Sequence, residues 1–207
     1  MPVAGLPSGV RAGDDGLQSL QQVVAARLLA RHAGGPGRSR LDHRERLARL
    51  DLHQGPPLGA WWKRGARAQA IGASRGGQTT KVHVVTDVLG RPAVIHLTPG
   101  NASDVTCAPE AVAAVPGRMK RLIADRGYDA DAFRRELRAL GTIPIIPGRR
   151  NRKRPIRHDE ARYKDRWRIE AAFCRLKDFR RVATRYDKLA ANFASAVALA
   201  SIVAFWC

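Results

Sequence analysis

Acidic side chains and cysteines are scarce in this sequence of 207 residues. Only 18 Asp and Glu oppose 37 Lys and Arg, which leaves a formal net charge of +19. The three cysteines are far apart and none belongs to a Cys-x-x-Cys pair, so we expect no zinc site. This usage indicates reduced thiols in a cytoplasmic protein.

We expect neither a secretory signal nor a membrane span in this sequence. Its N-terminus has no basic start followed by an apolar core. Residues 189–206 are uncharged and nearly long enough to cross a membrane. They are rich in Ala and Ser and include an Asn, so we expect a buried closing helix and no membrane partner.

The excess of basic residues predicts a polyanionic partner, usually nucleic acid. A solvated basic surface and a membrane-surface protein are the alternatives. The charge is densest between residues 149 and 188, where 16 Lys and Arg face 6 Asp and Glu. No aromatic-rich stacking motif is present, which argues against a basic RNA-associated structural protein.

Residues 1–66 differ in character from the rest of the chain. They are rich in Gly, Pro and Arg, and only residues 18–32 form an amphipathic run. We expect a poorly ordered segment here, followed by one domain over residues 67–207.

Residues 67–207 show the alternation of an α/β domain. Two β-type runs, at 80–86 and 93–97, flank the turn-forming stretch DVLGRP, which indicates a hairpin. The elements predicted after it are a helix starting at Ser103–Asp104, a strand at 120–125, a helix at 129–141, an edge strand with prolines at 142–148, a long basic helix at 162–181 and a closing helix at 194–206. This order predicts a central mixed sheet with flanking helices.

Asp125 is the first candidate for a functional carboxylate. It ends an apolar strand, and groups at the carboxyl ends of strands line the functional crevice of open α/β sheets. The alternative is a turn Asp that caps the next helix, although Asp129 is better placed for that role.

Glu170 is the second candidate, because it shares one face of a predicted helix with Tyr163, Arg166 and Lys177. Its alternative role is a surface ion pair with Arg166, four residues earlier. Functional chemistry requires Asp125 and Glu170 together. Mg²⁺ takes one or two carboxylates plus phosphate oxygens, and two such ions stabilise the attacking and leaving oxygens of a displacement at phosphorus. We therefore expect these two residues to hold Mg²⁺ or Mn²⁺ while the basic residues hold DNA.

The pattern Tyr163-x2-Arg166-x3-Glu170-x6-Lys177 resembles the signature around the catalytic Glu of bacterial insertion-sequence transposases of the DDE class. The stretch IGASRGGQTTKVHVVTDVLGRPAVIHLTPGNASD is similar to the segment after the first catalytic Asp of that family, and LIADRGYDADAFR to the segment that holds the second. The resemblance covers roughly residues 67–206. It implies an RNase-H-like, integrase-type fold and metal-dependent strand cleavage and transfer at transposon ends.

The resemblance also implies roles for individual residues. Asp125 would be the second catalytic Asp and Glu170 the catalytic Glu, both as metal ligands. Tyr163, Arg166 and Lys177 would be the accessory, DNA-binding positions. Asp87 matches a hairpin-turn Asp of the family, which its neighbours also favour. The implied partners are double-stranded transposon-end and target DNA, and the active form would be a homodimer.

The first catalytic Asp of the family has no clear counterpart. Asp42 and Asp51 are candidates, but neither has strand-like flanks, so we disfavour both. One hypothesis is that residues 1 to about 63 are translated out of frame, because suitable codons for residues 40–43 read Asp-Ser-Thr-Thr after a one-base shift. We then expect an N-terminal segment unlike the family over 1–66, a sheet incomplete at its N-terminal strand and weak catalysis. The alternative function is a non-catalytic, basic DNA-binding remnant.

Overall fold

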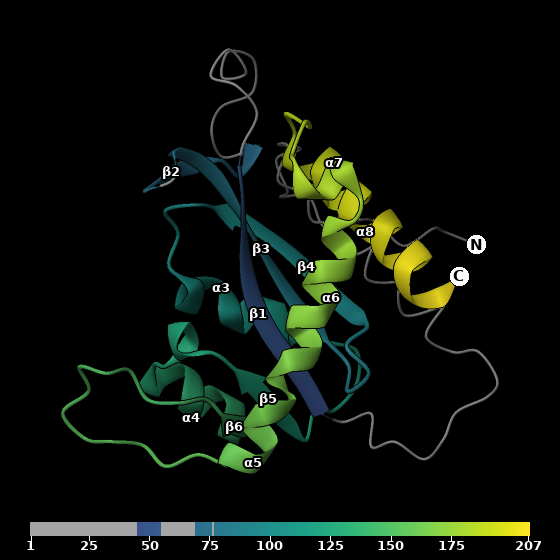
Figure 1. Cartoon of the computed structure of the whole chain (residues 1–207). Helices are drawn as coiled ribbons and strands as arrows, with labels where there is room; N and C mark the ends of the chain where they lie inside the picture. The colour runs from purple at the N-terminus through teal and green to yellow at the C-terminus, as the bar shows by residue number, and fades with distance from the viewer. Residues whose placement is uncertain (1–44, 55–68, 76) are drawn as a thin grey trace, which may run out of the picture.

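The computed structural model describes residues 45–54, 69–75 and 77–207. Six strands form one mixed sheet at the centre of this part of the chain (Figure 1). They are β1 (Glu45–Gln54), β2 (Gly72–Ser74), β3 (Gly77–Thr86), β4 (Pro92–Pro99), β5 (Arg121–Ala124) and β6 (Ile143–Ile145). The predicted hairpin is confirmed as β3 and β4, and the proline-bearing edge strand as β6.

The strand order is β2-β3-β1-β5-β6, and β4 also pairs with β3. β2 pairs with the first residues of β3, and β4 pairs with the remainder from Thr80 onward. β1 runs antiparallel to β3 and parallel to β5, and β5 runs parallel to β6. The expected RNase-H-like mixed sheet with flanking helices is confirmed.

The expectation that the sheet lacks its N-terminal strand is wrong. β1 lies inside the segment expected to be poorly ordered, and it is the central strand of the sheet. Its backbone pairs with β3 from Leu47 to Gln54 and with β5 from Glu45 to Ala48. Strand neighbours on both sides supply partners for its backbone groups, and such context outweighs weak local β propensity. The amphipathic run predicted at 18–32 lies outside the described residues.

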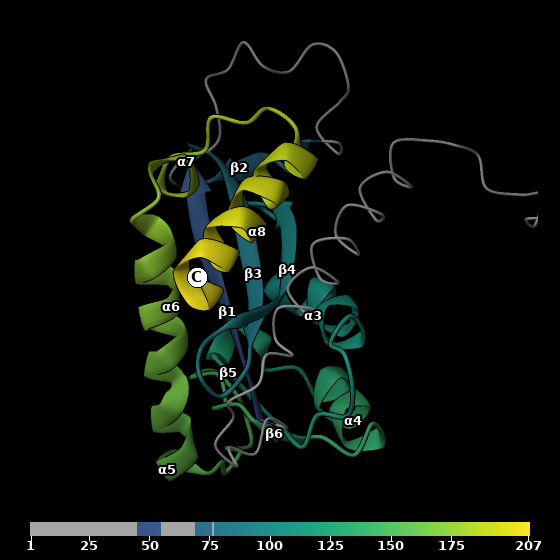
Figure 2. The same ribbon diagram turned by 90° about the vertical axis from the view of Figure 1, so that its right-hand side faces the viewer.

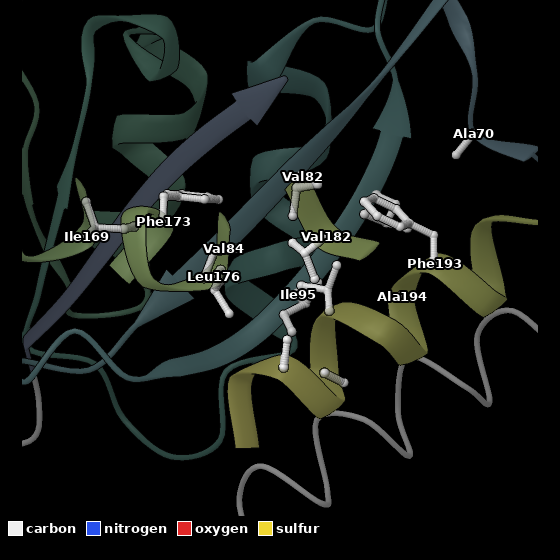
Figure 3. Packing of buried hydrophobic residues seen from close by; sticks show 14 of the residues in the cluster. Ala70, Val82, Val84, Ile95, Ile169, Phe173, Leu176, Val182, Phe193 and Ala194 are labelled. Atoms are coloured by element: carbon white, nitrogen blue, oxygen red, sulfur yellow. The ribbon is translucent and has the colours of Figure 1, made fainter. Parts of the chain in front are cut away.

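Helices cover both faces of the sheet (Figure 2). α6 (Trp167–Lys177) and α8 (Ala190–Trp206) lie on one face, and α3 (Asp104–Ala113) and α4 (Asp131–Ala139) on the other. Successive strand residues point to opposite faces, so β3 and β5 serve two separate cores. Val82 and Val84 pack with α6 and α8 (Figure 3), and Ile123 belongs to the same cluster. Val85 and Leu122 instead pack with α3 and α4.

The basic stretch 162–181 is not one helix. It consists of the end of α5 (Glu160–Tyr163), a 3-10 turn η3 (Lys164–Arg166), α6 and the short α7 (Arg180–Ala183). Ile169, Phe173 and Leu176 of α6 are buried and form the predicted apolar stripe. The closing helix is confirmed as α8, which packs on the sheet, and no described helix is long and apolar enough to span a membrane.

The turn between β3 and β4 depends on Asp87. Its Oδ1 accepts hydrogen bonds from the backbone N–H groups of Leu89 (2.9 Å) and Arg91 (3.0 Å). Its Oδ2 accepts one from Nε of Arg91 at 2.8 Å. The predicted turn role of Asp87 is therefore confirmed.

A buried arginine ties the sheet to the C-terminal helices. Arg185 is only 1% exposed, and its guanidinium lies 5.0 Å from the ring centroid of Phe193 on α8. Burial lowers the pKa of Arg185 to about 10, which still leaves it charged at neutral pH. Its guanidinium donates hydrogen bonds to the carbonyl oxygens of Gln69, Asp187 and Lys188 and to the hydroxyl of Thr80.

We predict that Arg185→Lys lowers the free energy of unfolding by about 2–4 kcal/mol. A lysine ammonium cannot reproduce the several N–H donors of the planar guanidinium, so buried oxygens would lose their hydrogen bonds. Urea denaturation measures the change. Arg180→Lys, at an exposed position on α7, is the matched control and should stay within about 0.5 kcal/mol. Equal stability of the two variants would contradict the role assigned to Arg185.

Candidate active site

Asp125 follows β5 at the carboxyl end of the strand. Its Oδ1 accepts a hydrogen bond from the backbone N–H of Gly127 at 2.8 Å and caps the 3-10 turn η2 (Arg126–Tyr128). Asp129, which looked better placed to cap the next helix, does not do so, because Ala130 is the N-cap residue of α4. The cap fixes the direction of the Asp125 carboxylate, which is partly exposed.

A second carboxylate lies against the same turn. A Cβ atom built on Gly127 would come 2.8 Å from Oδ2 of Asp104 and 2.9 Å from Oδ1 of Asp125. Asp104 begins α3, and its Oδ1 is 2.7 Å from Nζ of Lys81 on β3. This lysine also donates to the carbonyl of Ala102 at 2.7 Å. Lys81 therefore offsets part of the repulsion between two carboxylates that share one glycine.

Glu170 lies in the first turns of α6, where the helix dipole favours a negative charge. Its Oε1 is 2.8 Å from Nη2 of Arg166, and 42% of its side chain is exposed. The Arg166 guanidinium in turn lies 5.6 Å from the ring centroid of Tyr163. The structure therefore brings three of the four signature residues into one chain of contacts, and it also contains the alternative surface ion pair.

Lys177, the fourth signature residue, is in the last turn of α6 and is exposed. Asp125 and Glu170 lie on elements that flank the same strand, because β5 pairs with β1 and α6 packs across β1. Among the described residues, no group of three or more His, Cys, Asp and Glu side chains could hold a metal ion. Of the three acids that the family resemblance implies, the structure describes the side chains of two, Asp125 and Glu170.

The two candidates for the first acid differ in position. Asp42 lies outside the described residues. Asp51 belongs to β1, where its backbone is in register with Val82, so the expectation that it lacks a strand setting is wrong. It follows Ala48, the register partner of Ala124, by three residues. Because β1 and β5 are parallel, the backbone at Asp51 lies toward the same end of the strands as Asp125.

Sequence reasoning missed the ion pairs that support these residues. Lys81 and Asp104 are 23 residues apart, and only the packing of α3 against β3 brings them together. Asp129 is likewise paired with Arg134 and Arg152 in a buried cluster beside η2. The only sequence signal for the first pair is an acid at the start of a predicted helix.

A second cluster of titratable groups lies in the core on the α3 side of the sheet. The ring nitrogens of His83 are 3.0 Å from the Tyr128 hydroxyl and 2.8 Å from the Thr98 hydroxyl, and Cys107 Sγ is 3.3 Å from each nitrogen. Burial lowers the pKa of His83 to about 3 and raises that of Cys107 to about 12. A weakly basic imidazole and a protonated thiol make a poor nucleophilic pair, so the cluster is structural.

The mixed sheet, with one candidate acid at the end of β5 and another on the helix that crosses β1, defines an RNase-H-like domain. Residues 49–205 match the Transposase DDE domain family. This match covers most of the chain, which therefore belongs to that family.

Two relatives carry names that agree with the family. The chain is 35% identical over 121 residues to a protein assigned as transposase of insertion sequence element IS402 from Burkholderia cepacia, a match that covers 54% of this chain and 55% of the relative. It is 36% identical over 126 residues to the corresponding protein of element IS6501 from Brucella ovis, with 59% of this chain and 94% of the relative covered. The chain thus spans about half the length of the IS402 relative.

Two solved structures are also similar to the chain. One is a Mos1 strand transfer complex, with a TM-score of 0.43, 13% identity and coverage of 99% of this chain and 64% of the other. The second is a Mos1 transposase paired-end complex with the left transposon end, with a TM-score of 0.35, 14% identity and coverage of 97% and 66%.

We predict that Gly127→Ala lowers the free energy of unfolding by about 1–3 kcal/mol, because the new methyl group forces Oδ1 of Asp125 away from its Gly127 N–H donor and displaces Oδ2 of Asp104. Gly148→Ala is the matched control, since its nearest atoms would be 3.7 Å away. Adding Asp104→Ala to Gly127→Ala should recover part of the loss. Urea denaturation that gives the same value for both glycine variants would contradict this geometry.

We predict that the buried His83 makes the stability of the fold sensitive to acid. Its pKa in the folded protein, about 3, lies below the ordinary value near 6.5, so the unfolded chain takes up the proton first as pH falls. Stability is therefore complete above pH ~6.5 and declines below it, by up to about 1.4 kcal/mol per pH unit. His83→Gln should flatten the dependence between pH ~6.5 and ~4.5, measured by urea denaturation at each pH; an unchanged slope would refute the assignment.

Proposed function

We propose that the chain is a DNA transposase that performs metal-dependent strand cleavage and transfer at insertion-sequence ends. The observation that carries the proposal is the pairing of two placed carboxylates with a basic helix face in a chain of the DDE family. Asp125 stands at the carboxyl end of β5, and Glu170 stands on α6 beside Arg166. The family match over residues 49–205 supports assigning catalytic roles to both.

The residues fit a divalent metal ion by their donor chemistry. Asp125 and Glu170 supply carboxylate oxygens, the ligands that Mg²⁺ and Mn²⁺ prefer, and both side chains are partly exposed. Bound metal would supply charge stabilisation for the attacking and leaving oxygens at phosphorus. The family supports a divalent ion in general, and the choice of Mg²⁺ or Mn²⁺ is part of the proposal.

The chain's own residues prepare this site. The Gly127 N–H fixes one oxygen of Asp125, and this directs the rest of the carboxylate away from the turn. Arg166 holds Glu170 through an ion pair that phosphate can replace, because the guanidinium binds phosphate and carboxylate in the same manner. Tyr163 supports Arg166 from the other side, and the exposed Lys177 contacts the DNA backbone farther along α6.

We propose Asp51 over Asp42 as the third acid, on the position of its backbone alone. Asp51 lies on β1 toward the carboxyl end of the strand, and Asp125 lies at the carboxyl end of the parallel strand β5. The proposed partners are the double-stranded DNA of the element ends and the target. Two ends must be cut and joined, so the proposed active form is a homodimer, acting in the cytoplasm.

A non-catalytic DNA-binding remnant is the second candidate function. Two observations favour it: the described side chains do not assemble a group of three acids, and Glu170 is occupied by an ion pair with Arg166. The positive charge of residues 149–188 would maintain DNA binding without chemistry.

A cleavage assay on DNA that carries the element's terminal repeats separates the two functions. We predict Mg²⁺- or Mn²⁺-dependent cutting that falls by about a hundredfold or more in Glu170→Gln and Asp125→Asn, because each change removes a charged ligand. Glu160→Gln, at an exposed glutamate on α5, is the matched control and should retain activity.

The result also decides the status of the third acid. If cutting depends on Glu170, then Asp51→Asn should abolish it and Asp42→Asn should not. Salt-sensitive DNA binding without any cutting would favour the remnant, and cutting that survives Glu170→Gln would reject the proposed site.

A further inference from the structure

A buried aspartate links the turn that carries Asp125 to a basic loop. The Asp129 side chain is fully buried, and its Oδ1 is 2.8 Å from Nη2 of Arg134. Burial alone would raise the pKa of Asp129, but hydrogen bonds from the Arg149 backbone N–H and from Arg134 lower it below its usual value. Arg134 also donates to the carbonyl of Ile146 at 2.7 Å. The carboxylate is therefore a fixed anion at the base of the segment that follows β6.

Two arginines of that segment are held at this anion. Oδ2 of Asp129 accepts a hydrogen bond from the backbone N–H of Arg149 at 2.8 Å, and Nη1 of Arg152 lies 3.1 Å from both carboxylate oxygens. The Arg149 side chain donates to the carbonyl of Gly127 at 3.1 Å. Since the N–H of Gly127 binds Asp125, the loop is attached to the very turn that positions the candidate catalytic acid.

The remaining cations of the loop face solvent. Arg150, Lys153, Arg154 and Arg157 are all exposed, and within the described part of the chain none of them forms a salt bridge. Two nearby acids are already engaged, Asp131 by Arg152 and Asp159 by Arg162. The loop connects β6 to α5 and extends outward from the sheet beside α4 (Figure 1). Its outer surface thus carries four uncompensated positive charges.

We propose that residues 149–157 form a clamp for the phosphate backbone of the DNA strand that enters the site beside Asp125, and that Asp129 holds the clamp in place. This inference rests on the proposed function and deepens it by assigning the strand-binding surface. Arg and Lys side chains at phosphates fix register and orientation without reading sequence. A clamp held by a buried ion pair is ordered before DNA arrives, so binding loses less conformational entropy.

The clamp is tested by binding, without metal and without cleavage. The variant carries Arg150→Gln, Lys153→Gln, Arg154→Gln and Arg157→Gln, and the control carries Arg118→Gln, Lys120→Gln, Arg135→Gln and Arg138→Gln. The control residues are equally exposed and remove the same charge from the region of α4 and the start of β5. Fluorescence anisotropy with a labelled DNA duplex gives the affinity at several salt concentrations.

Each lost phosphate contact should reduce the slope of log affinity against log salt by about 0.9, so the clamp variant should lose about three to four and the control almost nothing. Equal slopes for the two variants would overturn the proposal. The same assay with an RNA duplex is the second test. If the clamp variant loses the same slope there and the unmodified protein binds RNA more tightly than DNA, the proposal is overturned and the surface is assigned to RNA.

Arg152 tests the anchoring separately. Arg152→Gln removes one of the two arginine attachments and so loosens the loop, while Asp129 keeps its bonds from Arg134 and from the Arg149 N–H and we expect the fold to be retained. The expected result is an affinity about three- to tenfold weaker with an unchanged salt slope, because the four outer cations remain but must be ordered on binding. Unchanged affinity, with a clamp variant that still loses its slope, would show that the anchor plays no part.

These readouts do not depend on catalysis. If Glu170→Gln leaves cutting intact, the proposed active site fails while the clamp can still stand. If the clamp variant binds like its control while cutting depends on Glu170, the clamp fails and the proposed function stands.

Discussion

The structure depends on the backbone pairing of β1 with two different neighbours. On one side β1 is antiparallel to β3, and on the other it is parallel to β5. This single strand therefore joins the hairpin half of the sheet to the half that ends in Asp125. α6, which carries Glu170, packs across the same strand. β1 is thus the strand that both β5 and α6 contact, so the relative position of the two candidate acids depends on its register.

Charge is the second constraint, and it acts through pairing. The chain carries a large positive excess, yet the acids around the site are each held by a specific donor. Asp104 is bound by Lys81, Asp129 by Arg134 and Arg152, and Glu170 by Arg166. Buried carboxylates persist only when paired in this way. The cations left over are on the surface, and they are the ones that can attract a phosphate backbone.

The sequence predicts those helices and strands whose local residue pattern is strong. It does not predict features that depend on contacts between residues far apart in the chain. The β3–β4 hairpin and α8 were predicted because alternation and an uncharged apolar run are local signals. β1 was missed because its strand form depends on partners far away in the chain. Motifs make Asp125 and Glu170 candidates and their catalytic role stays a prediction, whereas Lys81–Asp104 and Asp129–Arg152 join residues more than twenty positions apart and have no local signal.

The central claim is that Asp125 and Glu170 hold the same metal ion. Iron(II) in place of magnesium, with ascorbate and peroxide, produces radicals that cut the polypeptide beside the bound ion, and mass spectrometry locates the cuts. We predict cuts in two places, around Asp125 and around Glu170, and the loss of both in Glu170→Gln. Cuts confined to one of these places, or cuts that persist in the variant, would contradict a shared metal site.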